Sequence, residues 1–361
     1  MVFIFAMTFV ALLLPFLFLC LCISRCSGQS GDLAEVEALV KKWAPLVWLS
    51  PKELYLPMSV EEYLSNVNVV DSNGNQVQLP WNQDLPKYKT KQLYLVPKTE
   101  PNDTSSFIFG RNPNEHPVSI YAVLTYCPGP SSSATTQKDD TNTVYDKKEG
   151  GLYFHVSYWL FYPYNEGKDV CFLGKVPTPQ IFNTCFGKRK SIGNHLGDWE
   201  HMSLSFAGKS VPDKLFLAVH NAGAYYTYDE KNRYFRYQRK QESKRILPLP
   251  KAPKILRTQG DHPIIFSAAG SHGLWASSGE FEYVRVPKLT DSNGYGIPWK
   301  TWNNIEIYHL GQGPLPVWMA FKGKWGNPKG NCVLWQKLGL CEYTEGPSGI
   351  IRTNKDFYCY L

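Results

Sequence analysis

Segments in which apolar and polar residues alternate run through most of this chain and predict β-strands. They are rich in β-branched and aromatic residues and are bounded by turn residues. No strand–helix alternation is visible, which argues against a parallel α/β fold. We therefore expect a mainly β protein, an antiparallel β-sandwich with a few peripheral short helices, with a barrel as the alternative. The expected strands lie at residues 117–127, 151–164, 198–206, 214–222, 262–269, 280–286, 303–310 and 316–321.

Two segments near the start of the chain have helical periodicity instead. Apolar residues recur at helical spacing between Asp32 and Trp43, and Pro45 should end that helix. Ser59 followed by Glu62 forms a capping-box pattern that predicts a second, short helix. We expect a single β-sandwich-type domain over residues 29–361, with a helical segment at about 32–66 and a basic hairpin or loop at about 229–250.

The first 24 residues carry no charged side chain, which is typical of a secretory signal peptide. Small residues near position 28 favour cleavage there, so we predict a signal peptide over residues 1–28. The alternative is a membrane anchor formed by residues 2–24, because this stretch is long enough to span a bilayer. A cleaved signal predicts a secreted protein, and a vacuolar lumen is the alternative location.

Six cysteines remain after residue 28, and an even number in an exported chain indicates disulfides. Six thiols allow fifteen pairings, and the short loops favour Cys171 with Cys185 and Cys332 with Cys341. The sequon that begins at Asn102 predicts a glycoprotein. Residues 130–143 are polar and predict a loop.

The formal net charge of +7 is too weak to indicate nucleic-acid binding, but it mildly favours anionic surfaces. Residues 231–245 concentrate basic and aromatic side chains, which is typical either of a solvated hairpin or of a site for a membrane surface, a lipid headgroup or a glycan. The sequence predicts no oligomeric state. The candidate anion-binding residues are Arg233, Arg236, Arg239 and Lys240.

The segment GNHLGDWEH brings two carboxylates and two imidazoles to the start of an expected core strand. Strand alternation places Asp198 and Glu200 on one face, with Trp199 and His201 on the other. Two ionised carboxylates on a face that becomes apolar repel each other and lose solvation, and a cation would relieve both penalties. His195 could complete an oxygen-rich site for a divalent cation, Ca²⁺ or Mg²⁺ in the first instance, with Mn²⁺ or Zn²⁺ left open.

A simpler interpretation of the same residues needs no metal. In it Asp198 caps a turn and Glu200 pairs with an arginine or lysine at a sheet edge. The spacing alone does not separate the two interpretations.

Four segments together resemble the vacuolar protein sorting-associated protein sixty-two family, and the resemblance covers most of the mature chain. They are WAPLVWLSP, YWLFYPYNEG, GNHLGDWEHMSL and AAGSHGLWA. The family name implies a role in vacuolar protein sorting, which the residues themselves neither support nor exclude.

The third segment is also similar to the heptapeptide G-H-R-H-D-W-E of the necrosis- and ethylene-inducing-like proteins, secreted cytolysins with a β-sandwich fold. That resemblance implies a divalent cation held by His195, Asp198 and Glu200. The family has an upstream acidic ligand where this chain has Asn165, with Glu166 next to it, so both join the predicted metal set. The first glycine and second histidine of the heptapeptide are absent, because Asn194 and Gly197 replace them.

SAAGSHGLWAS, at residues 267–277, follows an apolar strand and places Ser271 beside His272. Adjacent residues on an extended chain point to opposite faces, so a nucleophile–base pair is not expected. The glycines allow a tight bend that aims His272 either into the cavity or into a buried structural position. Trp199 is the other candidate for the cavity.

Three functions follow. The first is a secreted protein that uses a divalent cation to recognise an anionic or glycosylated target, with membrane activity of the cytolysin kind as an option and therefore a toxin as one outcome. The second is a metal-dependent hydrolase with His201 or His272 as general base. The third is the vacuolar sorting role. Whether the protein is an enzyme is left open, and the first function favours a binding protein.

Overall fold

The computed structural model of the chain divides it into two compact units, residues 1–42 and 43–361. The predicted signal peptide, the sequon at residues 102–104 and the expected loop at 130–143 lie outside the residues that the structure describes. The described residues are 33–79, 92–99, 106–127, 152–174, 176–178, 184–220, 222–240, 251–284, 288–330, 332, 341–351 and 359.

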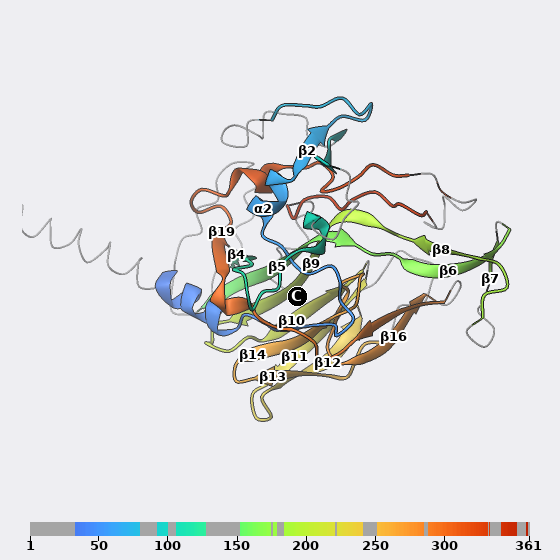
Figure 1. The fold of residues 1–361 in the computed structure, drawn as a ribbon. Helices are drawn as coiled ribbons and strands as arrows, with labels where there is room; N and C mark the ends of the chain where they lie inside the picture. Colours follow the sequence, from blue (N-terminus) through green and yellow to red (C-terminus); the bar gives the residue numbers. More distant parts are fainter. Residues whose placement is uncertain are drawn as a thin grey trace, which may run out of the picture. The chain divides into compact units, whose positions relative to one another are not determined.

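A large sheet forms the centre of the second unit and confirms the expectation of a mainly β protein (Figure 1). In spatial order its strands are β18 (Pro298–Lys300), β1 (Leu46–Leu49), β14 (His262–Ser267), β13 (Ile255–Gln259), β12 (Tyr234–Lys240), β11 (Ala222–Asp229), β10 (Lys214–Val219), β9 (His195–Ala207), β5 (Tyr153–Asn165), β4 (Ile120–Tyr126) and β19 (Ile305–His309), and β15 (Leu274–Trp275) pairs with β14.

This sheet is mixed, whereas the sequence predicted an antiparallel one. β1 pairs with β14 in parallel, and β19 pairs with β4 in parallel. Both parallel pairs join segments far apart in the chain, and alternation within a segment carries no information about the direction of its partner. The remaining pairs of the sheet are antiparallel.

β5 and β9 are the longest strands and pair along almost their whole length. One face of this pair carries Trp159, Phe161 and Trp199, which belong to a large aromatic core. That core also contains Tyr63 of the short helix α2 (Val60–Ser65) and Trp325 from the C-terminal region. The opposite face carries Asp198 and Glu200, followed along β9 by buried apolar residues.

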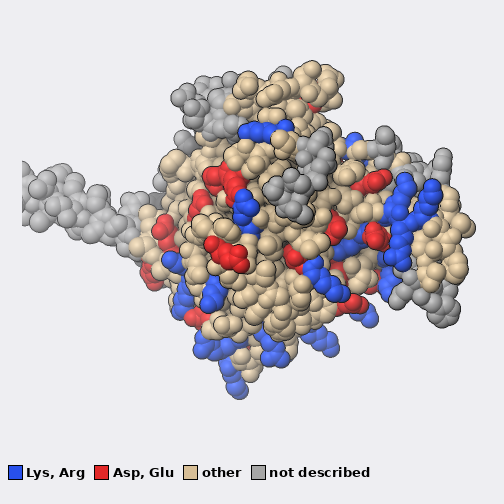
Figure 2. All heavy atoms as spheres, viewed as in Figure 1, with Lys and Arg blue, Asp and Glu red and all other residues tan. Residues whose placement is uncertain are grey.

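Three smaller sheets accompany the large one. They are β2 (Val67–Val70) with β3 (Tyr94–Pro97), β16 (Gly279–Val284) with β17 (Leu289–Asn293), and β7 (Val176–Thr178) with β6 (Lys168–Leu173) and β8 (Lys188–Ile192). Figure 2 shows Lys and Arg side chains gathered over the region of β6 and β8.

Helices are short and few in the described chain, as expected. Residues 33–42 form an α-helix, and α2 (Val60–Ser65) begins after Ser59, although the Ser59 side chain makes no capping hydrogen bond. The strand β1 lies between them, so residues 32–66 are not one helical segment. The 3₁₀ helices are η3 (Phe107–Phe109), η4 (Thr301–Asn303) and η5 (Val317–Ala320). The strand expected at residues 316–321 is wrong, because η5 occupies it.

All three cysteine pairs form disulfides. Cys171–Cys185 and Cys332–Cys341 confirm the two local pairings that the short loops favoured. The third, Cys127–Cys359, joins the end of β4 to the C-terminal end of the chain.

Candidate functional site

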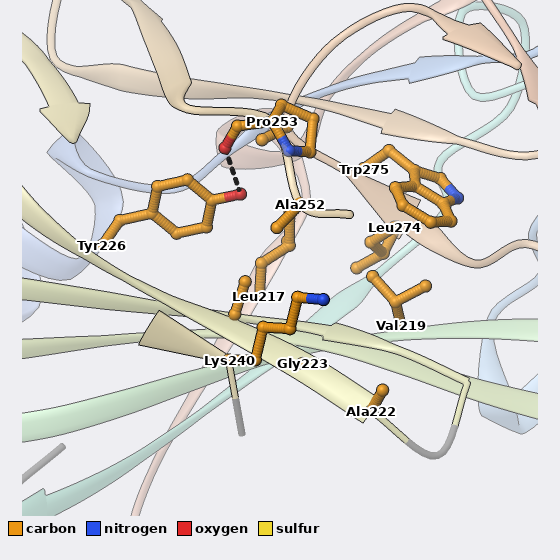
Figure 3. Close-up of a pocket in the computed structure, with 12 residues that line it drawn as sticks. Leu217, Val219, Ala222, Gly223, Tyr226, Lys240, Ala252, Pro253, Leu274 and Trp275 are labelled. Carbon is orange, nitrogen blue, oxygen red and sulfur yellow. Dashed lines mark hydrogen bonds between the residues drawn. The ribbon is translucent and has the colours of Figure 1, made fainter. Parts of the chain in front are cut away.

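The small pocket in Figure 3 has room for little more than a water molecule. It lies between β10, β11 and the segment that carries Trp275, with Lys240 at its side, and its volume is about 20 Å³. A larger, polar hollow of about 270 Å³ lies between residues 113–118 and the end of β18. Neither is lined by the carboxylates of the predicted metal site, which lie at the start of β9 and directly after the end of β5.

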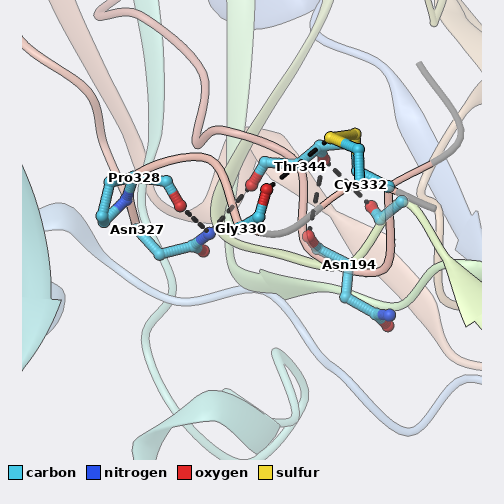
Figure 4. The surroundings of a disulfide bond; sticks show 8 residues. Asn194, Asn327, Pro328, Gly330, Cys332 and Thr344 are labelled. Atoms are coloured by element: carbon cyan, nitrogen blue, oxygen red, sulfur yellow. Dashed lines mark hydrogen bonds between the residues drawn. A yellow bond between two sulfur atoms is a disulfide. The ribbon is translucent and has the colours of Figure 1, made fainter. Parts of the chain in front are cut away.

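The start of β9 is held by the C-terminal segment next to a disulfide (Figure 4). The Gly193 amide donates to the Cys341 carbonyl at 2.8 Å, and the Thr344 amide donates to the Asn194 carbonyl at 2.9 Å. The Asn194 side chain donates to the Glu342 carbonyl and accepts from the Gly167 amide, both at 2.9 Å. Asn194 therefore fixes the strand that carries Asp198.

Gly197 explains one departure from the cytolysin heptapeptide. Its backbone has φ +61°, and a Cβ at this position would lie 1.8 Å from the Trp325 carbonyl oxygen. No side chain fits there without moving backbone, so the histidine of the heptapeptide has no space in this fold.

His272 occupies the place where a cation was expected. Its Nδ1 donates to Asp198 Oδ2 at 3.0 Å, and its Nε2 donates to the Tyr55 carbonyl at 3.0 Å, with Glu53 Oε1 at 3.7 Å. The ring stacks on Tyr162 with 3.8 Å between centroids. Because both ring nitrogens donate, the ring is an imidazolium cation between two carboxylates.

The electrostatics of this group agree with that protonation state. Burial lowers the pKa of His272, but the charges and hydrogen bonds of Glu53 and Asp198 outweigh it and raise the pKa to about 9. Burial raises the pKa of Glu53, but His272 and the amides of Tyr55 and Gly270 lower it below its ordinary value. We name Glu53, His272 and Asp198 the imidazolium cluster.

Glu53 was not predicted from the sequence. It lies in the irregular segment after β1, where SPKELYLP contains no motif that links it to His272. Its carboxylate accepts from the Tyr55 amide at 2.8 Å and from the Gly270 amide at 3.0 Å. Only the tertiary structure brings this segment to His272.

Two other residues of the predicted metal site, Asn165 and His195, donate to backbone carbonyls instead of to the imidazolium cluster. The Asn165 amide donates to the Gly193 carbonyl at 2.9 Å, and His195 Nδ1 donates to the Gly197 carbonyl at 2.8 Å. Glu166 is exposed, and burial of part of its carboxyl together with the nearby charge of Glu53 raises its pKa. Glu200 is buried on the face of Asp198, as strand alternation predicted.

This arrangement does not fit the cation site that the resemblance implies. Asp198 already has a cationic partner, and Asn165 and His195 are directed to backbone carbonyls. Within the described residues no group of three or more His, Cys, Asp or Glu side chains is arranged to hold a metal. A metal at these residues therefore stays a prediction.

Trp199 and His201 lie on the opposite face of β9. Trp199 stacks on Trp318 with 5.9 Å between ring centroids, and His201 stacks on Trp159 at 4.3 Å. The structure thus brings neither residue to His272. For the hydrolase alternative, His201 is on the wrong face and His272 has no free lone pair, so neither is placed as a general base.

A second buried network of polar side chains centres on Asp291. Asp291 accepts from Ser271 Oγ at 2.6 Å, from His220 Nε2 at 2.8 Å and from Trp275 Nε1 at 3.0 Å, and Lys168 Nζ lies 3.3 Å away. Ser271 and His272 therefore face different partners, but they do so in a turn in which His272 has φ +54°, and not on the extended chain that the alternation argument assumed. Asp291 was not predicted as a site residue, because DSNG at 291–294 has the composition of a turn.

The predicted anion-binding residues in and just before β12 are largely paired within the protein. Arg233 pairs with Asp261 at 3.0 Å, and Arg236 pairs with Asp229 at 3.1 Å. The Arg239 guanidinium lies 4.4 Å above the Tyr225 ring. Residues 241–250, the rest of the expected basic hairpin, lie outside the described residues.

None of the helices in the described part of the chain has the length and apolar character that a membrane span requires. No protein-family model matches the chain. No solved structure matches it either.

Two proteins of Saccharomyces cerevisiae match most of the chain. Vacuolar protein sorting-associated protein TDA6, whose name is a provisional assignment, is 27% identical over 314 residues, covering 81% of this chain and 61% of its own length. Vacuolar protein sorting-associated protein 62 is 25% identical over 342 residues, covering 87% of this chain and 65% of its own. The chain thus spans less than two thirds of either relative. These matches confirm the resemblance to the vacuolar protein sorting-associated protein 62 family that the four sequence segments predicted.

Proposed function

We propose that this protein acts in vacuolar protein sorting as a binding protein on the lumenal side of a membrane. The observation that carries the proposal is its similarity, along more than four fifths of the chain, to two yeast proteins with that name. Three disulfides favour an oxidising compartment, because thiols in the cytosol are kept reduced.

The imidazolium cluster supports binding rather than metal-dependent chemistry. A catalytic metal needs carboxylates that are free to coordinate it and an open position for water. Here Asp198 and Glu53 neutralise His272 and hold the segments after β1 and β14 against β9. The cluster thereby positions backbone segments, which is what a rigid binding scaffold requires.

The test is a sorting assay in yeast that lacks both relatives. We expect expression of this chain to lower the fraction of a soluble vacuolar hydrolase that the cells secrete. The matched control is the Gly197→Val variant, which should fail because the fold has no space for the side chain. Unchanged secretion, with wild-type protein present in the cells, would count against the proposal.

A second candidate is cation-dependent recognition of an anionic or glycosylated target. It is supported by Glu200, which is buried on the same face of β9 as Asp198 and is not a member of the imidazolium cluster. Elemental analysis of the purified protein and calorimetric titration with Ca²⁺ test it. One bound ion per protein chain, absent from the Glu200→Ala variant, would support this candidate. If titration of the folded protein with Ca²⁺ released or absorbed no heat, the candidate would be rejected.

A further inference from the structure

We propose that the tip of the β7–β6–β8 sheet docks on an anionic lipid membrane. This inference goes beyond the sorting role and does not depend on it. It rests on a rigid small sheet, on apolar side chains exposed at its end, and on basic residues placed just behind them. We call this end, formed by Leu173, Val176, Phe186 and residues 188–190, the basic–apolar tip.

The small sheet is held in a fixed conformation by packing, by a disulfide and by a close backbone contact. Its inner side packs Val170, Phe172 and Ile192 into a buried cluster. The Cys171–Cys185 disulfide ties β6 to the segment that enters β8. Gly187 lies so close to the Phe172 carbonyl that a Cβ there would be 2.0 Å from its oxygen. Side chains at the end of the sheet are therefore displayed in fixed positions.

The end of the sheet exposes three large apolar side chains. Phe186 is 73% exposed, Leu173 is 63% exposed and Val176 is 54% exposed. Leu173 and Val176 are cross-strand partners at the turn between β6 and β7, and Phe186 stands two residues before β8. Among the described residues seven large apolar side chains are exposed, and three of them are here. Such clustering, unlike scattered exposure, marks an interaction surface.

Basic side chains follow the apolar end directly. Lys188 and Arg189 are exposed, and the Lys190 side chain is 39% exposed with Glu342 at 4.0 Å. The acidic residue in β6, Asp169, lies opposite Ser191, farther from the end. Figure 2 shows the Lys and Arg side chains of this region in blue beside the tan, uncharged residues at its end.

The spacing of the two kinds of side chain suits a bilayer surface. Leu173 lies one residue beyond Phe172, which pairs with Lys188, and two residues beyond Cys171, which pairs with Arg189. A strand rises by about 3.3 Å per residue, so Arg189 lies about 7 Å behind Leu173. Peripheral proteins insert apolar groups about 5–10 Å into the boundary between headgroups and acyl chains. Apolar tip residues at that depth would leave the basic groups at the phosphates, whose negative charge they complement. An acidic protein partner would use the basic residues but would leave the apolar end without a role.

The experiment is flotation of the full chain with vesicles. Phosphatidylcholine mixed with phosphatidylserine is compared with phosphatidylcholine alone. We expect binding to the anionic vesicles that weakens as salt is added. Leu173→Ser with Phe186→Ser should weaken binding at least tenfold. Lys188→Gln with Arg189→Gln should weaken it by about fivefold for each charge removed.

Matched controls lie elsewhere on the surface. Leu54→Ser removes an apolar side chain that is 62% exposed, and Arg257→Gln removes an exposed charge of β13. Neither should change binding by more than about twofold. All variants keep residues 1–32, so no difference between them comes from that segment. Equal thermal unfolding of each variant and the wild type shows that the fold is intact.

The inference is overturned by any of three results. They are absence of binding to anionic vesicles, equal binding to neutral vesicles, and wild-type binding by both tip variants. Wild-type binding to anionic vesicles by the apolar variant alone would also overturn it, since the exposed apolar side chains would then have no part in the contact.

Discussion

At the scale of single residues, His272 decides how Asp198 and Glu53 are neutralised. Strand alternation correctly placed Asp198 and Glu200 on one buried face, and the physical need for a positive charge there was real. The charge comes from a side chain of the same protein. A buried imidazolium with both nitrogens donating is held more tightly than a surface ion pair, because solvent does not compete with it.

The imidazolium cluster makes stability depend on pH in the alkaline range. The pKa of His272 is about 9 in the folded protein and 6.5 in the unfolded one. The stabilisation is therefore complete below pH 6.5 and is lost as the pH rises through 9, with a size on the order of 3 kcal/mol. Denaturant unfolding across this range measures it. His272→Gln should unfold with a flatter pH dependence, and equal slopes in both proteins would contradict the assignment.

Gly197 gives the sharpest residue-level prediction for the fold. Gly197→Ala forces a Cβ against the Trp325 carbonyl at a φ of +61°, so we expect a loss of about 3 kcal/mol or more in the free energy of unfolding. The control is Gly74→Ala, which has a φ of +83° but no atom within 4 Å of the added Cβ. It should cost about 1 kcal/mol. Urea unfolding compares the two, and similar losses would show that the close contact is unimportant.

At the scale of elements, periodicity predicted strands where it was strong and failed where tertiary contacts decide. The segment DSNG occurs twice. At residues 71–74 it forms a turn in which Asp71 accepts hydrogen bonds from the amides of Asn73 and Asn75. At 291–294 the first three of the same four residues belong to β17, and Asp291 is fully buried among His220, Ser271 and Trp275. Local composition is the same, so only the distant partners separate the two outcomes.

The candidate site shows the same division. The face on which Asp198 and Glu200 lie followed from alternation, because side-chain direction is a property of the strand itself. The role of Glu53 did not follow, since 145 residues separate it from Asp198 and no local pattern encodes their approach. The parallel pairing of β1 with β14 brings the segments that carry Glu53 and His272 together, and His272 in turn contacts Asp198.

The two basic elements should behave differently toward anionic surfaces. Arg233, just before β12, and Arg236, within it, already have carboxylate partners, so Arg233→Gln with Arg236→Gln should change binding to phosphatidylserine vesicles by less than about twofold. Lys188→Gln with Arg189→Gln in β8 should weaken binding far more, because these side chains belong to the basic–apolar tip and lie beside its exposed apolar residues. Flotation of both variants measures the difference. A larger effect from β12 would move the anionic contact to that strand.

At the scale of the whole molecule, the disulfides act on chain segments of very different length. Cys171–Cys185 closes a loop of 14 residues and Cys332–Cys341 one of 9, within single regions of the fold. Cys127–Cys359 spans 232 residues and ties the end of the chain to β4. If a cross-link stabilises by restricting the unfolded chain, its effect grows with the logarithm of loop length.

Loop length therefore predicts a ranking. Replacing both cysteines of the 127–359 pair with serine should lower the free energy of unfolding by about 5 kcal/mol, against about 3 kcal/mol for either short loop. The three double variants, each with the other two disulfides intact, are compared by chemical unfolding under non-reducing conditions. The short 332–341 loop holds the segment that binds Gly193 and Asn194, so its loss should also speed amide exchange at Thr344. If its loss instead costs more than that of the long loop, native contacts at the start of β9, rather than the unfolded chain, carry the stabilisation.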